Sequence, residues 1–157
     1  MKIKALSFWE PWASLIGLKT IETRPRKFNY RGPLLICASV FGAFPGRKRR
    51  YVIERLHVPQ IRQALSKLFK VDDVLGIYFK LSFGQAVSIC NLTDCHSTNG
   101  TGWMQGMTPE QIEREKVFGD FSPDRFALRL ENIRPIKPFP VIGRQGLFDV
   151  EVPEGLI

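Results

Sequence analysis

The spacing of hydrophobic and polar positions predicts a series of short strands. Residues 2–7 alternate between the two kinds of position, which is typical of a short first strand. An uninterrupted apolar run at 34–40 follows a Gly-Pro turn and predicts a central strand that is buried on both faces. Residues 85–93 and 126–136 predict two further strands, whereas 77–83 is apolar and aromatic and fits either a helix or a strand.

Helices are predicted between these strands. Pro11 suits the first turn of a short helix that ends near Leu18 or Lys19. The pattern at 48–56 also fits a helix, and residues 59–70 predict a clearer amphipathic helix with a basic exposed side. A Thr-Pro-Glu-Gln sequence at 108–111 matches a capping box that opens another helix. Five to seven short strands with two or three helices predict an α+β domain, with a small barrel as one form of it.

A polar, glycine-rich stretch from 94 to 106 predicts a long loop. A loop of this length in a compact domain is usually functional or mobile. Trp103 lies within it, so its ring is expected at the surface.

Length and composition fit a single soluble domain of residues 1–157. The chain is 44% hydrophobic and 24% charged, as in ordinary globular proteins. No apolar run approaches the roughly 18 residues of a membrane span, and the N-terminus lacks the pattern of a signal peptide. Three cysteines, an odd number, fit a reducing compartment better than a disulfide framework. A cytoplasmic protein with no membrane partner is therefore expected.

Basic residues are concentrated in the first part of the chain. Residues 1–70 hold fifteen Lys and Arg against three Asp and Glu, a net +12, whereas residues 71–157 hold eight against twelve, a net −4. Such asymmetry predicts a face that binds a polyanion, with nucleic acid as the partner, although a solvated basic surface would have the same composition. The candidates for phosphate contacts are the consecutive basic residues Arg47, Lys48, Arg49 and Arg50.

Cys90, Cys95 and His96 resemble a metal cluster only superficially. Their spacing does not match a zinc motif, and a fourth ligand is missing. Cys90 and Cys95 are expected to face opposite sides of one strand. Buried structural thiols are the preferred interpretation, and neither a metal nor a cofactor is expected.

The tryptophans are candidates for base stacking, since an aromatic platform beside arginines suits an unpaired base. Trp12 falls on the apolar stripe of its helix and is predicted to belong to the core. Trp9 lies outside this stripe and fits either role. Trp103 is the ring most expected to be displayed.

Lys19, Glu22 and Arg24 lie within six residues, where a helix gives way to a strand. A carboxylate between two cations stays ionised and can accept a hydrogen bond from the amino or imino group of a base. The same trio could equally be a structural salt-bridge network. Both interpretations follow from the residues alone.

Several blocks of the sequence resemble the ASCH domain, a family named for activating signal cointegrator homology within the PUA-like superfamily. The most specific blocks are Pro-Trp-Ala-Ser-Leu-Ile at 11–16, Lys-Thr-Ile-Glu-Thr-Arg at 19–24 and Tyr-Arg-Gly-Pro-Leu-Leu-Ile at 30–36. Weaker blocks follow at 84–95, 126–136 and 143–148. The resemblance spans nearly the whole chain, and residues 41–76 and 96–122 look like insertions between family elements.

The resemblance implies a PUA-like small mixed β-barrel of about five to seven strands with two to four peripheral helices. It also implies a cleft lined by residues 19–24 and a ligand that is RNA or a modified nucleotide. Some ASCH proteins are amidohydrolases acting on N4-acetylcytidine, in which a lysine activates a threonine three residues on, and some are ribonucleases. Lys19 matches that lysine, but Glu22 occupies the threonine's position, and Cys37 stands where many members have a histidine.

Three functions follow as hypotheses. In the first, the protein binds RNA or a modified nucleotide, with Trp9, Lys19, Glu22, Arg24 and Trp103 as the ligand-binding residues. In the second, it is a hydrolase of RNA or a modified nucleoside, with Lys19 as the base and Glu22 as a carboxylate for proton transfer. In the third, the basic face meets an acidic protein partner.

Overall fold

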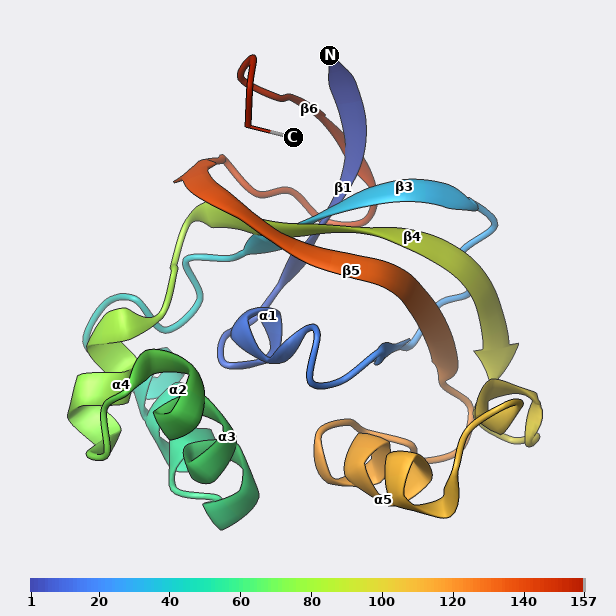
Figure 1. Ribbon diagram of the computed structural model, residues 1–157, viewed down its shortest axis with the longest axis horizontal. Helices are drawn as coiled ribbons and strands as arrows, with labels where there is room; N and C mark the ends of the chain where they lie inside the picture. Colours follow the sequence, from blue (N-terminus) through green and yellow to red (C-terminus); the bar gives the residue numbers. More distant parts are fainter. Residues whose placement is uncertain (157) are drawn as a thin grey trace.

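The computed structural model describes residues 1–156, which form one mixed sheet with helices packed against it (Figure 1). The strands are β1 (Lys2–Phe8), β2 (Ile21–Arg24), β3 (Gly32–Ala38), β4 (Gln85–Ser97), β5 (Phe126–Pro140) and β6 (Phe148–Glu151). The helices are α1 (Trp12–Leu15), α2 (Arg47–Leu56), α3 (Pro59–Phe69), α4 (Val74–Lys80), the 3-10 turn η1 (Gly102–Met104) and α5 (Pro109–Val117).

The strands are hydrogen-bonded in the order β2-β5-β4-β3-β1-β6. β1 and β3 run parallel, and each of the other neighbouring pairs is antiparallel. Figure 1 shows α1 below the middle of the curved sheet, with α2–α4 on its left and α5 on its right. The α+β prediction is confirmed. The sheet is open, however, because no ladder among residues 1–156 joins the edge strands β2 and β6 into the closed barrel that the resemblance implied.

β3 is buried on both faces, as its apolar run predicts. Leu34 and Ile36 point into one hydrophobic cluster, and Leu35 and Cys37 point into a second cluster that contains Phe148. The period of two along a strand separates the two sets of side chains. The curvature of the sheet therefore encloses hydrophobic side chains on both of its sides.

β4 places both of its cysteines in the same cluster. Cys90 and Cys95 are both buried and both pack against the first cluster. The register of β4 against β5 shifts between Leu92 and Asp94. Because a bulge adds one residue and so reverses the alternation beyond it, the expectation that the two thiols face opposite sides is wrong. Their burial supports the interpretation as structural thiols.

The helical predictions differ from the structure mainly at α1 and α4. α1 ends at Leu15 because Ile16 is extended and Gly17 adopts a φ of +112°, which favours glycine. The undecided segment 77–83 lies largely in α4, whose first turn is capped by Asp73. With five α-helices among the described residues, the protein has one more than the resemblance implied.

Both segments expected to be insertions contain helices. Residues 41–76 contain α2 and α3, which pack with α4 around a hydrophobic cluster of their own. Residues 96–122 contain η1 and α5, and the capping box predicted at Thr108 is confirmed. Among the described residues, no helix is long and apolar enough to cross a membrane.

Candidate functional site

The trio Lys19, Glu22 and Arg24 is assembled as predicted. Lys19 Nζ lies 3.5 Å from Glu22 Oε1. Arg24 contacts the other oxygen, Glu22 Oε2, through Nε at 3.2 Å and through its terminal nitrogen at 3.1 Å. Their side chains are 2%, 12% and 23% exposed in that order. The trio therefore runs from a buried cation, through a carboxylate, to a cation that reaches the surface.

Lys19 is held from beneath by groups that suit an ammonium ion. Its Nζ donates to the backbone carbonyl of Phe118 at 3.0 Å, just beyond the C-terminus of α5, and lies 5.4 Å from the ring centroid of Trp12. A cation at a helix C-terminus interacts favourably with the helix dipole, and the face of an indole ring also attracts it. With so little of its side chain exposed, Lys19 forms the floor of the site.

α5 also fixes the start of β2. Glu115 is buried and accepts hydrogen bonds from the backbone N–H of Thr20 at 2.9 Å and from that of Ile21 at 3.1 Å. A third hydrogen bond to Glu115, 3.3 Å long, comes from the Thr20 hydroxyl. Sequence analysis missed this residue, because it lies about 95 positions from its partners and nothing local marks it.

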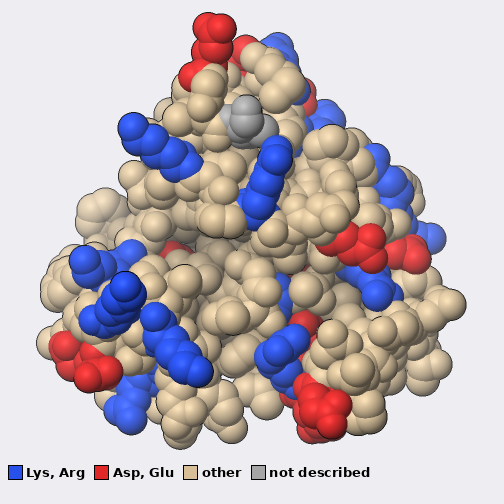
Figure 2. All heavy atoms as spheres, in the orientation of Figure 1, with Lys and Arg blue, Asp and Glu red and all other residues tan. Residues whose placement is uncertain are grey.

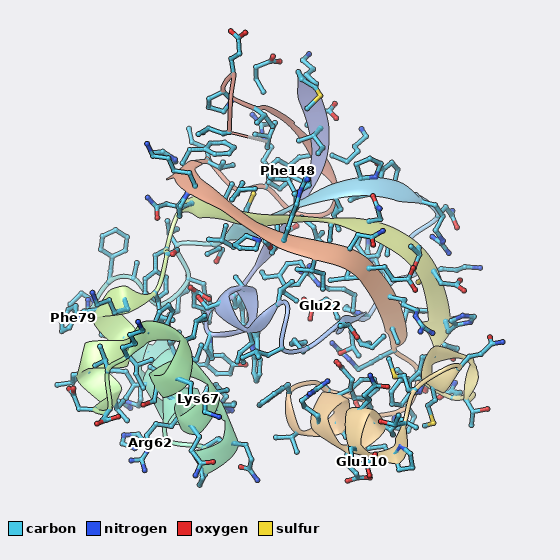
Figure 3. The ribbon with its side chains drawn as sticks, viewed as in Figure 1. Glu22, Arg62, Lys67, Phe79, Glu110 and Phe148 are labelled. Carbon is cyan, nitrogen blue, oxygen red and sulfur yellow. The ribbon has the colours of Figure 1, made fainter. Side chains whose placement is uncertain are left out.

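Arg24 ties the trio to the end of β1. Its guanidinium donates to the backbone carbonyl of Ser7 at 2.7 Å and lies 5.1 Å from the ring centroid of Phe8. Thr23, between Glu22 and Arg24, points the other way, is buried and receives a hydrogen bond from Arg125. The charged groups of β2 are therefore all on one face, and Figure 3 shows Glu22 in the region between α1 and α5.

A cavity of about 380 Å³ lies beside the trio, between α5 and β5. Gly17 and Thr20 contribute to its wall from the stretch that carries the trio. The charged and amide side chains of its lining come from Gln111, Arg114, Glu115, Arg129, Glu131 and Asn132. Lys19, Glu22 and Arg24 are outside this lining, so the cleft implied for residues 19–24 stays a prediction.

The three tryptophans have different environments. Trp9 is 47% exposed, whereas Trp103 is only 2% exposed and stacks on Phe121 with 4.3 Å between ring centroids. The expectation that Trp103 is displayed is wrong, because η1 turns its ring into a cluster with Ile21 and leaves no face for a base. Trp12 is partly buried against the α2–α4 cluster, as predicted.

The basic cluster begins α2 and is mostly exposed. Arg47, Lys48 and Arg50 project to solvent. Arg49 is half-buried instead, since it donates to the Ala43 carbonyl at 2.8 Å and lies over the Tyr78 ring. In Figure 2, Lys and Arg side chains gather over the α2–α4 lobe. Three of the four predicted phosphate contacts are therefore accessible, and Arg49 has a structural role as well.

Glu10 is a second buried carboxylate that sequence analysis did not single out. It accepts from the backbone N–H and the hydroxyl of Ser14 at 2.8 and 2.7 Å, and from the backbone N–H of Ser82 at 3.0 Å. Burial raises the pKa of Glu10, while these hydrogen bonds lower it to a smaller extent. The i,i+4 spacing of Glu10 and Ser14 is the one local signal that could have identified it.

The described residues contain no group of three or more His, Cys, Asp or Glu side chains placed to hold a metal ion. His96 lies 2.8 Å from Asp94 and is half-buried. Burial raises the pKa of the Cys37 and Cys90 thiols to about 12, so both remain protonated.

Comparisons with known proteins give structural matches alone. No protein-family model and no curated protein matches the chain. A crystal structure of ASCH from Zymomonas mobilis is similar over 94% of this chain and 87% of its own, with 15% identity and a TM-score of 0.48. Two mutants of that ASCH match at 14% identity with TM-scores of 0.48 and 0.47, over 94% of this chain and 89% and 87% of theirs. These structures bear the name of the family that the sequence motifs resemble. Identity and TM-score this low say nothing about function.

Proposed function

We propose that this protein binds RNA or a modified nucleotide, with Glu22 and Arg24 facing the base and the start of α2 facing the phosphates. The observation that carries the proposal is the exposure gradient of the trio, in which Glu22 and Arg24 keep 12% and 23% of their side chains exposed beside a buried ammonium.

The chemistry of Glu22 suits the edge of a base. Arg24 contacts only Oε2, and Lys19 lies 3.5 Å from Oε1, so the carboxylate keeps lone pairs for further donors. An amino or imino group of a base would donate to Glu22, while the guanidinium of Arg24 would donate to a ring nitrogen or carbonyl.

The exposed cations Arg47, Lys48 and Arg50 supply the complementary contacts to phosphates. Such contacts add affinity without reading the sequence, and they weaken with salt because binding releases counterions. With two to four phosphate contacts to a single strand, a rise from 50 to 200 mM salt should weaken binding by about 7- to 50-fold.

A titration of fluorescein-labelled 12-nucleotide RNA, followed by anisotropy at several salt concentrations, tests both the base contact and the phosphate contacts of the proposal. Replacing Arg47 and Arg50 together by alanine should lower the salt slope by about 1.4, since each phosphate contact contributes about 0.7. A matched control replaces Lys2 and Lys137, which are also exposed but lie on β1 and β5. That double variant should leave the slope unchanged.

Glu22→Gln separates base recognition from general electrostatics, because the two predict opposite changes in the affinity for RNA. If Glu22 is only part of a charged surface, removing its negative charge should tighten the binding of a polyanion. If Glu22 accepts from a base, the same change should weaken binding by about 5- to 150-fold at every salt concentration, which corresponds to the loss of one base contact. Tighter or unchanged binding by Glu22→Gln contradicts the proposed role.

A hydrolase is the second candidate, and the contact between Lys19 and Glu22 is the observation in its favour. Against it, Lys19 is nearly inaccessible and already donates to Phe118, so Glu22 would have to meet the substrate. Incubation of the unaltered protein and of Lys19→Ala with single-stranded RNA and with N4-acetylcytidine decides between a hydrolase and a binding protein. Absence of turnover by the unaltered protein would exclude the hydrolase.

A further inference from the structure

Trp9, Phe41 and Tyr51 form a compact aromatic platform at the surface. The rings of Trp9 and Phe41 are stacked, with centroids 3.8 Å apart and planes within 2° of parallel. Tyr51 stands edge-on to both, at 5.6 Å from Trp9 and 5.7 Å from Phe41. The two stacked rings therefore present one continuous aromatic unit, braced from the side by the third.

One face of this unit is open. Phe41 covers one face of the Trp9 indole, yet Trp9 is still 47% exposed, whereas the neighbouring ring of Phe8 is buried. An indole that served only to cover the core would be largely buried, as Trp103 is. The outer face of Trp9 is thus available to a ligand.

The platform is assembled from three separate segments: the end of β1, the turn after β3, and α2. Gly42 fixes the turn beside Phe41. Its φ is +89°, and a Cβ at this position would come within 2.4 Å of Val52 on α2. Because another residue would be strained at this φ and would press against Val52, glycine favours the observed turn that carries Phe41.

Cations border the platform. Lys48 Nζ lies 5.5 Å from the ring centroid of Phe41, and the guanidinium of Arg55 lies 4.5 Å from that of Tyr51. α2 carries five basic residues and one acidic residue in all. An aromatic face with positive charge along its rim is the arrangement that binds single-stranded nucleic acid, whose bases stack while its phosphates meet the cations.

The backbone connects the platform to the trio. Arg24 donates to the carbonyl of Ser7 and lies over the ring of Phe8, and Trp9 is the next residue along the chain. Three consecutive residues thus connect the two surfaces.

We propose that Trp9, backed by Phe41 and Tyr51, stacks an unpaired base adjacent to the one that the trio reads. This inference rests on the proposed function and narrows it: the ligand is a single strand of at least two nucleotides, since a base inside a duplex has no free face. RNA and DNA share this chemistry, so oligonucleotides of both kinds enter the test.

The test measures the Kd of 12-nucleotide oligo(A) RNA, oligo(A) DNA and a 12-base-pair duplex with the full chain. Trp9→Ala should raise the Kd for the single strands by roughly 5- to 150-fold, the loss of about one stacked base, and Trp9→Phe should restore most of the affinity. Phe79→Ala is the matched control. Phe79 is an aromatic residue on α4 that is 75% exposed and makes no contact with the platform rings (Figure 3).

Tryptophan fluorescence gives a second readout that does not depend on affinity. Because Trp9 is far more exposed than Trp103, a stacked base should quench mainly the emission of Trp9. The quenching should disappear in Trp9→Phe while binding persists. Circular dichroism and the Tm of each variant verify that it is folded.

The outcomes separate this inference from the proposed function. Wild-type affinity in Trp9→Ala, or undiminished quenching in Trp9→Phe, overturns the platform and leaves nucleic-acid binding in place. Tighter binding of the duplex than of the single strands also overturns it. If the unaltered protein binds none of the three probes, the proposed function fails and the platform fails with it.

Discussion

Removal of the Glu115 carboxylate tests whether α5 holds the candidate site in position. In Glu115→Ala, the buried backbone N–H of Ile21 and the part-buried N–H of Thr20 lose their acceptor, and the Thr20 hydroxyl loses a partner. All of these groups lie at the start of β2, immediately before Glu22.

The expected loss follows from the two orphaned N–H groups. Each buried donor left without an acceptor costs about 1–3 kcal/mol, so the free energy of unfolding should fall by about 2–6 kcal/mol. A domain of this size is stable by about 5–15 kcal/mol, and the loss is therefore a large part of the total. Glu115→Gln keeps one carbonyl oxygen but turns an NH₂ group toward one of the donors, and should lose about half as much.

Urea unfolding followed by circular dichroism measures the effect. With an m-value of about 2 kcal/mol/M, the midpoint should fall by about 1–3 M while m stays constant. Glu113→Ala, at an exposed position of the same helix, is the control and should change stability by about 0.5 kcal/mol or less. If Glu115→Ala is no more destabilising than this control, the two hydrogen bonds do not hold β2 to α5.

Three further predictions concern buried groups elsewhere. Burial raises the pKa of Glu10 above the ordinary 4.5, so the folded protein binds this proton more readily than the unfolded chain. The contribution of this group to the free energy of unfolding should be lost as the pH rises from about 4.5 through the raised pKa, by up to about 1.4 kcal/mol per pH unit. Urea unfolding of Glu10→Gln at the same pH values should lack this pH dependence. Equal dependence in both proteins would contradict a raised pKa of Glu10. The three buried cysteines, with the thiol pKa values of Cys37 and Cys90 at about 12, should react with a thiol reagent at pH 8 only after unfolding; rapid labelling of the native protein would show that they are accessible. Gly42→Ala forces a left-handed φ on alanine and places a Cβ against Val52, so the Tm of the variant should fall by several degrees. The quenching of tryptophan fluorescence by oligo(A) should weaken as well. A Tm equal to that of the wild type would refute the close approach of Gly42 to Val52.

Features with a local cause could be predicted from the sequence. The capping box at Thr108, the amphipathic pattern of α3 and the apolar run of β3 each depend on residues a few positions apart, and all three form as expected. The trio belongs to the same class, since Lys19 and Glu22 are separated by only three positions.

Features that depend on residues far apart in the chain could not be predicted from the sequence. The polar, glycine-rich surroundings of Trp103 predicted exposure, but Phe121 lies across the turn and covers its ring. Phe41 and Tyr51 carry no local sign that they meet Trp9, because the platform forms only when β1, the turn after β3 and α2 come together. The bulges of β4 likewise depend on its pairing with β5, and they place Cys95 on the same face as Cys90, whereas simple alternation puts the two on opposite faces.

The charged residues of β2 also matter because β2 lies at the edge of the sheet. β2 is an edge strand of four residues, and among residues 1–156 no strand pairs with its outer side. Exposed strand edges are templates for pairing with other chains, and charged residues on a short edge oppose such association. We therefore expect Glu22 and Arg24 to oppose self-association as well as forming the candidate site. Any variant that makes both positions apolar should be examined for self-association before a loss of binding is attributed to the ligand site.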